Sequence, residues 1–148
     1  MPSIIPSYIY TLFASIIVGT IVICACSLST LNVRNEAEEQ QLLNVAEYIS
    51  TESLAVVSHA KTENSTSTLR LNVPSLIGDK RYWIQIANDS LRAWVEAGFG
   101  TIAQSSEHRI YIPAEVSASG TYISGSGAAI LACYSDSSGV HLTLSGGN

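Results

Sequence analysis

The feature that most constrains this chain is a long apolar run near its N-terminus. No Asp, Glu, Lys or Arg occurs from residue 2 to residue 33. A helix over residues 8–26 would be about 28 Å long at 1.5 Å per residue, close to the roughly 30 Å hydrocarbon core of a bilayer. A helix also pairs all of its own backbone groups, as lipid requires. We therefore expect the N-terminal segment to form a membrane-spanning helix.

The apolar run continues into a polar but strongly helix-forming segment, residues 31–60. This segment contains no Pro or Gly and is rich in Glu, Gln, Ala and Leu, which favour helix. Its apolar residues recur at helical spacing and form one stripe, which predicts packing against the following domain. The five residues expected to make this helix–head contact are Leu42, Ala46, Ile49, Leu54 and Val57. The acidic cluster at residues 36–39 is expected to form a solvated face.

Three small or weakly polar residues interrupt the apolar run: Ser15, Gly19 and Thr20. Small residues allow helices in lipid to approach closely, so these three are the candidate helix–helix packing positions. The alternative is that a lone span tolerates them. Cys24 and Cys26 are interpreted as small apolar packing residues, and Cys133 as a buried core residue.

Beyond a polar linker at residues 61–67, the hydrophobic period changes from helical to two. Turn residues separate seven short segments of this kind, which predicts an antiparallel sandwich or small barrel. The expected strands are residues 68–73, 82–87, 91–96, 107–112, 116–124, 127–134 and 140–145. The predicted fold class is α+β, a long N-terminal helix (apolar then amphipathic) packed on an antiparallel β-sandwich head. We divide the chain into residues 1–30, the membrane or filament-core half of the helix, residues 31–61, its amphipathic half, and residues 62–148, the β domain.

Composition argues against several functions. The net charge is −5 and the seven basic residues are scattered, which disfavours nucleic acid as a partner. The three histidines share no motif, no zinc spacing is present and no nucleotide fingerprint has its structural context. We therefore expect no enzymatic activity, no cofactor and no metal. Trp83 and Trp94 fall on neighbouring expected strands and form either a sugar-stacking surface or a cross-strand packing pair.

The body of the chain is expected outside the membrane, with the N-terminus inside. A short flank precedes the span and more than a hundred residues follow it. Two sequons point the same way and make Asn64 and Asn88 candidate N-glycosylation acceptors.

An N-terminal helix, apolar then amphipathic, joined to a small β domain resembles the type IV pilin-like subunits, which include archaeal archaellins and adhesion pilins. Residues 71–86, LNVPSLIGDKRYWIQI, also look like a segment of archaeal secreted pilin-like proteins, in which a strand ends at Pro, an Ile-Gly turn follows and a Tyr-x-Ile strand returns. The resemblance implies a structural subunit of an extracellular filament for adhesion or motility. Its partners would be the membrane before assembly and copies of itself afterwards.

The chain departs from the pilin pattern in two places. No Lys or Arg precedes the apolar run, and the fifth residue is Ile5 where bacterial pilins carry an acid near the mature N-terminus. The alternative is a single-span membrane-anchored β domain that binds an envelope partner such as a surface-layer protein, similar to the stator proteins of the archaellum. A third hypothesis is an anchored glycan-binding module that uses Trp83 and Trp94.

Overall fold

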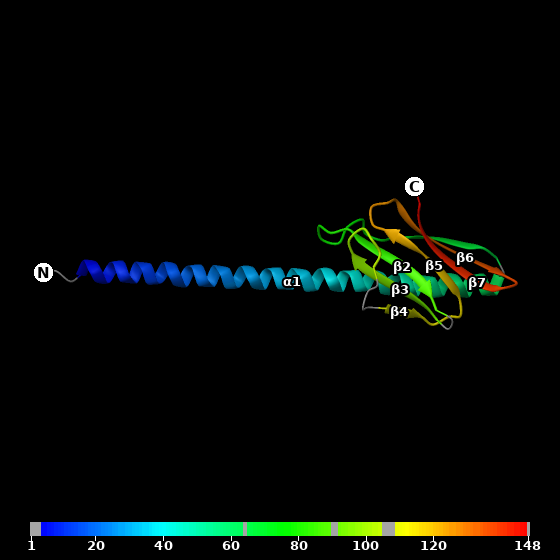
Figure 1. Ribbon diagram of the computed structural model, residues 1–148, viewed down its shortest axis with the longest axis horizontal. Helices are drawn as coiled ribbons and strands as arrows, with labels where there is room; N and C mark the ends of the chain where they lie inside the picture. Colours follow the sequence, from blue (N-terminus) through cyan, green and yellow to red (C-terminus); the bar gives the residue numbers. More distant parts are fainter. Residues whose placement is uncertain (1–3, 64, 90–91, 105–108, 148) are drawn as a thin grey trace. The chain divides into compact units, whose positions relative to one another are not determined.

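The N-terminal helix α1 spans Ile4–Glu63 in the computed structural model, which describes residues 4–63, 65–89, 92–104 and 109–147 (Figure 1). Pro6 lies in its first turn, where a missing N–H breaks no helical hydrogen bond. The expected linker at residues 61–67 is therefore shorter than predicted, because the helix continues through Glu63. The chain divides into two units, Met1–Ala37 and Glu38–Asn148, which are described separately below.

In the described part of the chain seven strands follow the helix, and all belong to one sheet with the order β1-β6-β7-β5-β2-β3-β4. Their bounds are β1 Ser67–Leu71, β2 Tyr82–Asn88, β3 Ala93–Phe99, β4 Arg109–Ile112, β5 Ser117–Ile123, β6 Ala128–Asp136 and β7 Gly139–Gly147. Every neighbouring pair is antiparallel except β5 and β7, which run parallel. The α+β prediction is confirmed: a long N-terminal helix packs on a mostly antiparallel sheet. The described strands form one hydrogen-bonded sheet, and the amphipathic half of α1 supplies the second layer of the core.

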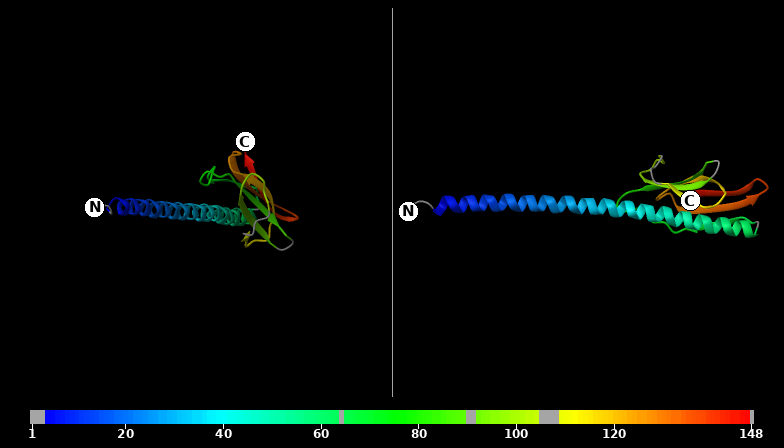
Figure 2. Two further views of the ribbon diagram at one scale, coloured as in Figure 1. Left: turned by 60° about the vertical axis from the view of Figure 1, so that its left-hand side comes forward. Right: turned by 90° about the horizontal axis from the view of Figure 1, so that it is seen from below.

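The core lies between this sheet and residues 38–63 of α1, which run along one face of the sheet (Figure 2). Period-two alternation sends Ile84 and Ile86 of β2 into the core, and their cross-strand partners Ala97 and Val95 of β3 lie on the same side. Residues of the other parity face outward. The strand pattern in the sequence therefore located the buried face, except that β3 extends through Phe99, beyond the expected strand end at residue 96.

Among the described residues Tyr82 is the largest fully buried side chain, and its hydrogen bonds hold the start of β2 in place. Its hydroxyl donates to the Pro74 carbonyl, and its backbone N–H donates to Ser124 Oγ at 2.9 Å. Burial, and after it the neighbouring Tyr122, raises the pKa of the Tyr82 phenol. The residue is therefore neutral at every physiological pH.

The expected solvated acidic face is wrong for Glu38, which is 5% exposed. Glu38 precedes Leu42 by four residues and Val45 by seven, so helical spacing turns it toward the sheet. Its carboxylate pairs with the ammonium of Lys80 at 2.6 Å. The neighbouring Glu36 and Glu39 are exposed, as predicted.

Candidate functional site: the apolar half of the helix

The apolar half of α1, taken here as residues 8–33, carries large hydrophobic side chains on every side of the helix. Each of them is at least 46% exposed. They are Tyr8, Ile9, Tyr10, Leu12, Phe13, Ile16, Ile17, Val18, Ile21, Val22, Ile23, Leu28, Leu31 and Val33. Among the described residues α1 is the one helix long and apolar enough to span a membrane.

Exposure of this kind in water is energetically prohibitive. Twelve of these side chains are Ile, Leu, Val or Phe. Leaving a dozen such side chains mostly hydrated costs on the order of 10–20 kcal/mol, at about 1.5–3 kcal/mol for full burial of each. A whole domain is typically stable by only about 5–15 kcal/mol. By length and composition this half of the helix could therefore anchor the chain in a membrane.

Four hydroxyl groups in the apolar half are bonded within the helix. The predicted packing residues Ser15 and Thr20 donate to the carbonyls of Thr11 and Ile16, each at 2.9 Å. Ser27 and Thr30 make the same bond to the residues four before them, also at 2.9 Å. Such bonds remove the penalty of carrying a hydroxyl into lipid, since each O–H already has an acceptor.

Gly19, the third predicted packing residue, has open space beside it. A Cβ added to it would meet nothing within 4 Å. The single chain therefore gives no structural reason for glycine at this position. Cys24 and Cys26 are likewise exposed on the helix.

The predicted helix–head residues fall into two groups in the structure. Leu42, Ala46, Ile49 and Val57 are buried in the core cluster, whereas Leu54 is 38% exposed, and its prediction was wrong. Leu54 follows the fully buried Ser53, and one residue turns a helix by about 100°, which points Leu54 away from the sheet. The helix residues missed by the prediction are Val45, Val56 and Ala60, which continue the same three-and-four spacing.

Only one of the two candidate glycosylation acceptors, Asn88, lies among the described residues. Asn64 lies outside the described residues. Asn88 ends β2, and its carboxamide is engaged: Oδ1 accepts from the Ala118 N–H at 3.1 Å and Nδ2 donates to the Asp89 carbonyl at 3.0 Å. Ser90, the third residue of this sequon, is also outside the described part of the chain.

Trp83 and Trp94 lie on the same outward face of the sheet but do not offer two open rings. Trp83 is 3% exposed and lies so close to Gly98 that a Cβ there would overlap its indole. The guanidinium carbon of Arg109 lies 4.7 Å from the centre of the Trp94 ring, and Arg109 also pairs with the buried Glu96. A sugar would have to displace Arg109 to stack there, so the arrangement fits the packing interpretation of these tryptophans better.

A serine, a histidine and an aspartate meet at the turn between β6 and β7, a combination that the sequence analysis did not single out. Ser138 Oγ lies 3.0 Å and Asp136 Oδ1 3.4 Å from the same nitrogen of His141, Nε2. In a catalytic triad the acid and the serine contact opposite ring nitrogens. Here Asp136 Oδ1 also accepts from the backbone N–H groups of Ser138 and Gly139, which is the pattern of a turn. These hydrogen bonds stabilise the turn of the β6–β7 hairpin.

The remaining chemistry-bearing groups are dispersed. Among the described residues no cluster of three or more His, Cys, Asp or Glu could hold a metal ion. Cys133 is fully buried, and burial raises the pKa of its thiol, which disfavours the reactive thiolate.

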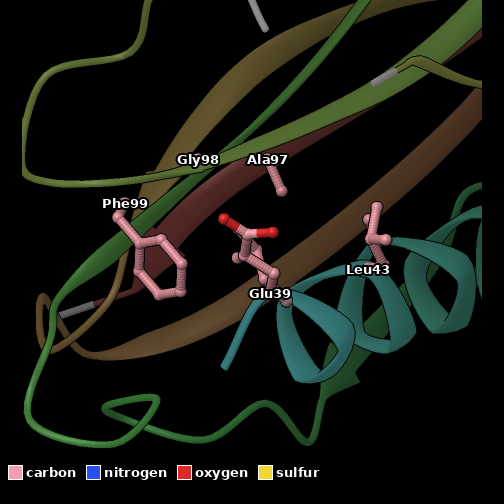
Figure 3. A pocket seen from close by; sticks show the side chains of 7 residues that line it. Glu39, Leu43, Ala97, Gly98 and Phe99 are labelled. Carbon is pink, nitrogen blue, oxygen red and sulfur yellow. The ribbon is translucent and has the colours of Figure 1, made fainter. Parts of the chain in front are cut away.

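An open hollow of about 230 Å³ lies between α1 and the end of β3 (Figure 3). Its lining residues are Glu39, Leu42, Leu43, Ala46, Ala97, Gly98 and Phe99. Figure 3 shows Leu43 and Ala97 bordering the space from the helix and from the strand. The hollow marks a place where helix and sheet are packed less closely than in the core.

No protein-family model, no curated protein and no solved structure matches this chain.

Proposed function

We propose that this protein is a structural subunit of an extracellular type IV pilus-like filament, held in the membrane by its apolar helix before assembly. The observation that supports this most is the exposure of the large hydrophobic side chains at residues 8–33, while the head has a hydrophobic core of its own. Lipid covers the segment before assembly, and a bundle of identical helices covers it afterwards. Contacts between such copies are head to tail, so the assembly extends rather than closing into a ring.

The cell surface is the proposed location, with the N-terminus inside and the head outside. The head would then face surface-layer protein or glycan, and the archaeal pilin-like segment at residues 71–86 suggests this setting. Protease treatment of intact cells should remove the head and leave a membrane-bound fragment of α1. An untouched head in intact cells, with cleavage only after lysis, would reverse the proposed orientation.

The filament proposal is tested on sheared surface material. We expect the protein to pellet with filaments that are visible by electron microscopy and to be recognised along their length by an antibody against the head. Recovery of all of the protein in the membrane fraction would refute a filament role and leave the anchor role.

Gly19→Leu gives a sharper test of helix–helix contact. Because a side chain at this position meets nothing in the single chain, Leu should leave the fold and membrane insertion unchanged, and leucine favours helix over glycine. A loss of filaments with normal membrane levels would therefore come from neighbouring helices. Val18→Leu, which adds bulk at an already large residue, is the matched control. Normal filament yield in Gly19→Leu would show that no helix approaches closely there.

A single-span membrane anchor for an envelope-binding β domain is the second candidate function. It is favoured by the hydroxyl groups of Ser15, Thr20, Ser27 and Thr30, which bond within their own helix and need no partner helix. Chemical crosslinking in membranes distinguishes the two candidates, since a filament subunit should give a ladder of its own multiples and an anchor should give one adduct with a different protein.

A further inference from the structure

The helix–sheet interface of the head is not uniform along α1. Leu42 and Val45, in its first turns, are 8% and 9% exposed, whereas Ile49 and Ala60 are fully buried. The open hollow beside β3 lies against residues 39–46 only. The first two turns of the docked helix are therefore held by weaker packing than the turns that follow.

A second contact holds these first turns from the other side. The loop from residue 72 to residue 81, here called the strap, joins β1 to β2 and crosses α1 at Glu38. Its tip is a tight turn in which the N–H groups of Ile77 and Lys80 each donate to the other's carbonyl, at 3.1 and 3.0 Å. Ile77 is buried in the core cluster, and the Lys80 ammonium contacts the Glu38 carboxylate at 2.6 Å.

The tip of the strap is shaped around Glu38. Gly78 has φ of +58°, a left-handed conformation that suits glycine, and a Cβ there would overlap the Glu38 carboxylate. Lys80 also lies 5.2 Å from the centre of the Phe99 ring, which lines the hollow. One lysine thus links the helix, the strap and the end of β3.

We propose that residues 38–46 and the strap form one locally opening unit, closed by the Glu38–Lys80 pair, which releases about two turns of α1 while the rest of the head stays folded. Local units of this kind open where packing is poor and few contacts hold a segment. Opening lengthens the undocked helix and uncovers Leu42, Ala46 and Phe99. In the filament proposed above, this would let a head adjust its position on its own helix, but the unit itself does not depend on that function.

Hydrogen exchange of the full-length protein in detergent micelles tests this proposal, because single copies suffice. Lys80→Met removes the ammonium that the buried Glu38 carboxylate contacts at 2.6 Å, and the loss of one partner of a buried ion pair is destabilising. Solvent screens the half-exposed Lys80 and reduces this effect, so we expect the exchange rate to rise by about tenfold or somewhat more. The acceleration should occur together in residues 38–46 and in the strap, and not in residues 49–60 or in the β6–β7 hairpin.

Two further variants distinguish a local role of the Glu38–Lys80 pair in closing this unit from a general contribution to the stability of the head. Lys61→Met removes an exposed lysine from the last turn of α1 and should change neither segment. The double variant Glu38→Met/Lys80→Met replaces the pair by apolar side chains of similar length and should restore protection in both segments. Acceleration spread evenly over the head in Lys80→Met, or confined to the strap while residues 38–46 stay protected, would overturn the proposal.

Discussion

The two halves of α1 share one secondary structure but differ in what covers them. Residues 8–33 carry large hydrophobic side chains that are exposed on every side of the helix, whereas residues 38–63 bury their hydrophobic stripe against a sheet. Hydrogen bonds within the helix serve both halves equally, so they do not explain the difference. What differs is the distribution of apolar side chains, which lie all around the first half and along one face of the second.

This difference indicates which half supports the fold and which half determines location. A stripe on one side can be covered by one partner, and the chain supplies that partner in its own sheet. A helix that is apolar all round needs cover on every side, as a bilayer or the interior of a larger protein assembly provides. Changes in the first half should therefore alter where the protein resides, and changes in the second half should alter whether the head folds.

The largest effect on folding is expected from Ile49→Ala. Ile49 is fully buried between α1 and the sheet, and truncation of such a residue destabilises by about 2–5 kcal/mol. Thermal unfolding of the detergent-solubilised protein should show a clear drop in Tm of the head. Ile17→Ala, an equal truncation in the apolar half, should leave this Tm unchanged, and an equal drop in both variants would remove the distinction between the halves.

The next largest effect is on membrane insertion. Ile17→Arg places a charge near the middle of the apolar run, at about 2.5–3.5 kcal/mol on insertion scales. We expect much of the protein to leave the membrane fraction during alkaline extraction. Thr51→Arg, at an exposed position of the amphipathic half, is the control and should stay membrane-bound. Full membrane retention of Ile17→Arg would count against residues 8–26 as the span.

Ser53→Ala is expected to stabilise the head. Ser53 is fully buried in the helix–sheet interface, and its hydroxyl has no hydrogen-bond partner among the described residues. Removing it avoids the desolvation of an unbonded O–H, and alanine is the better helix former, so a gain of about 1 kcal/mol follows. Chemical denaturation should show a higher midpoint, whereas Ser58→Ala, at an exposed site, should shift it less. A lower midpoint for Ser53→Ala would reveal a hydrogen bond that the hydroxyl makes in solution.

The smallest effect is expected at the β6–β7 hairpin. Hydrogen bonds from the Ser138 side chain and backbone lower the pKa of Asp136. A lowered folded-state pKa means that ionised Asp136 stabilises the fold above its unfolded pKa of about 3.9, and that this contribution is lost as pH falls through the folded value. Asp136→Asn should therefore narrow the stability difference between pH 7 and pH 3 slightly. An unchanged difference would show that the hairpin bonds do not favour the ionised form.

Much of the fold could be predicted because local pattern and tertiary role agree in most of this chain. The absence of Gly and Pro between Gly19 and Pro74 lets the helix continue to Glu63, and the change to period two locates the strands and their buried face. Leu42, Ala46, Ile49 and Val57 lie in the core cluster. The prediction that Leu54 packs on the sheet was wrong, because residue type alone does not distinguish a leucine beside the buried helix stripe from one within it.

Other features depend on residues far apart in the sequence. The burial of Glu38 depends on Lys80, which reaches it from a loop that follows β1, and no local pattern distinguishes Glu38 from the exposed Glu36 and Glu39. The sequence also left undecided whether the rings of Trp83 and Trp94 are exposed. Their environment depends on Gly98, which lies against Trp83, and on the Arg109 guanidinium, which lies over Trp94.

The sequence by itself determined that one helix runs through the apolar and the amphipathic segments, that its first half is apolar without interruption and that the strands alternate, since each follows from neighbouring residues and backbone geometry. Only the tertiary structure decided that the strands form one sheet with a parallel β5–β7 pair and that α1 is its second layer. It also decided that the strap closes on Glu38. These features arise from contacts between segments that any one stretch of sequence leaves unspecified, because the free energy of burial depends on which surfaces meet.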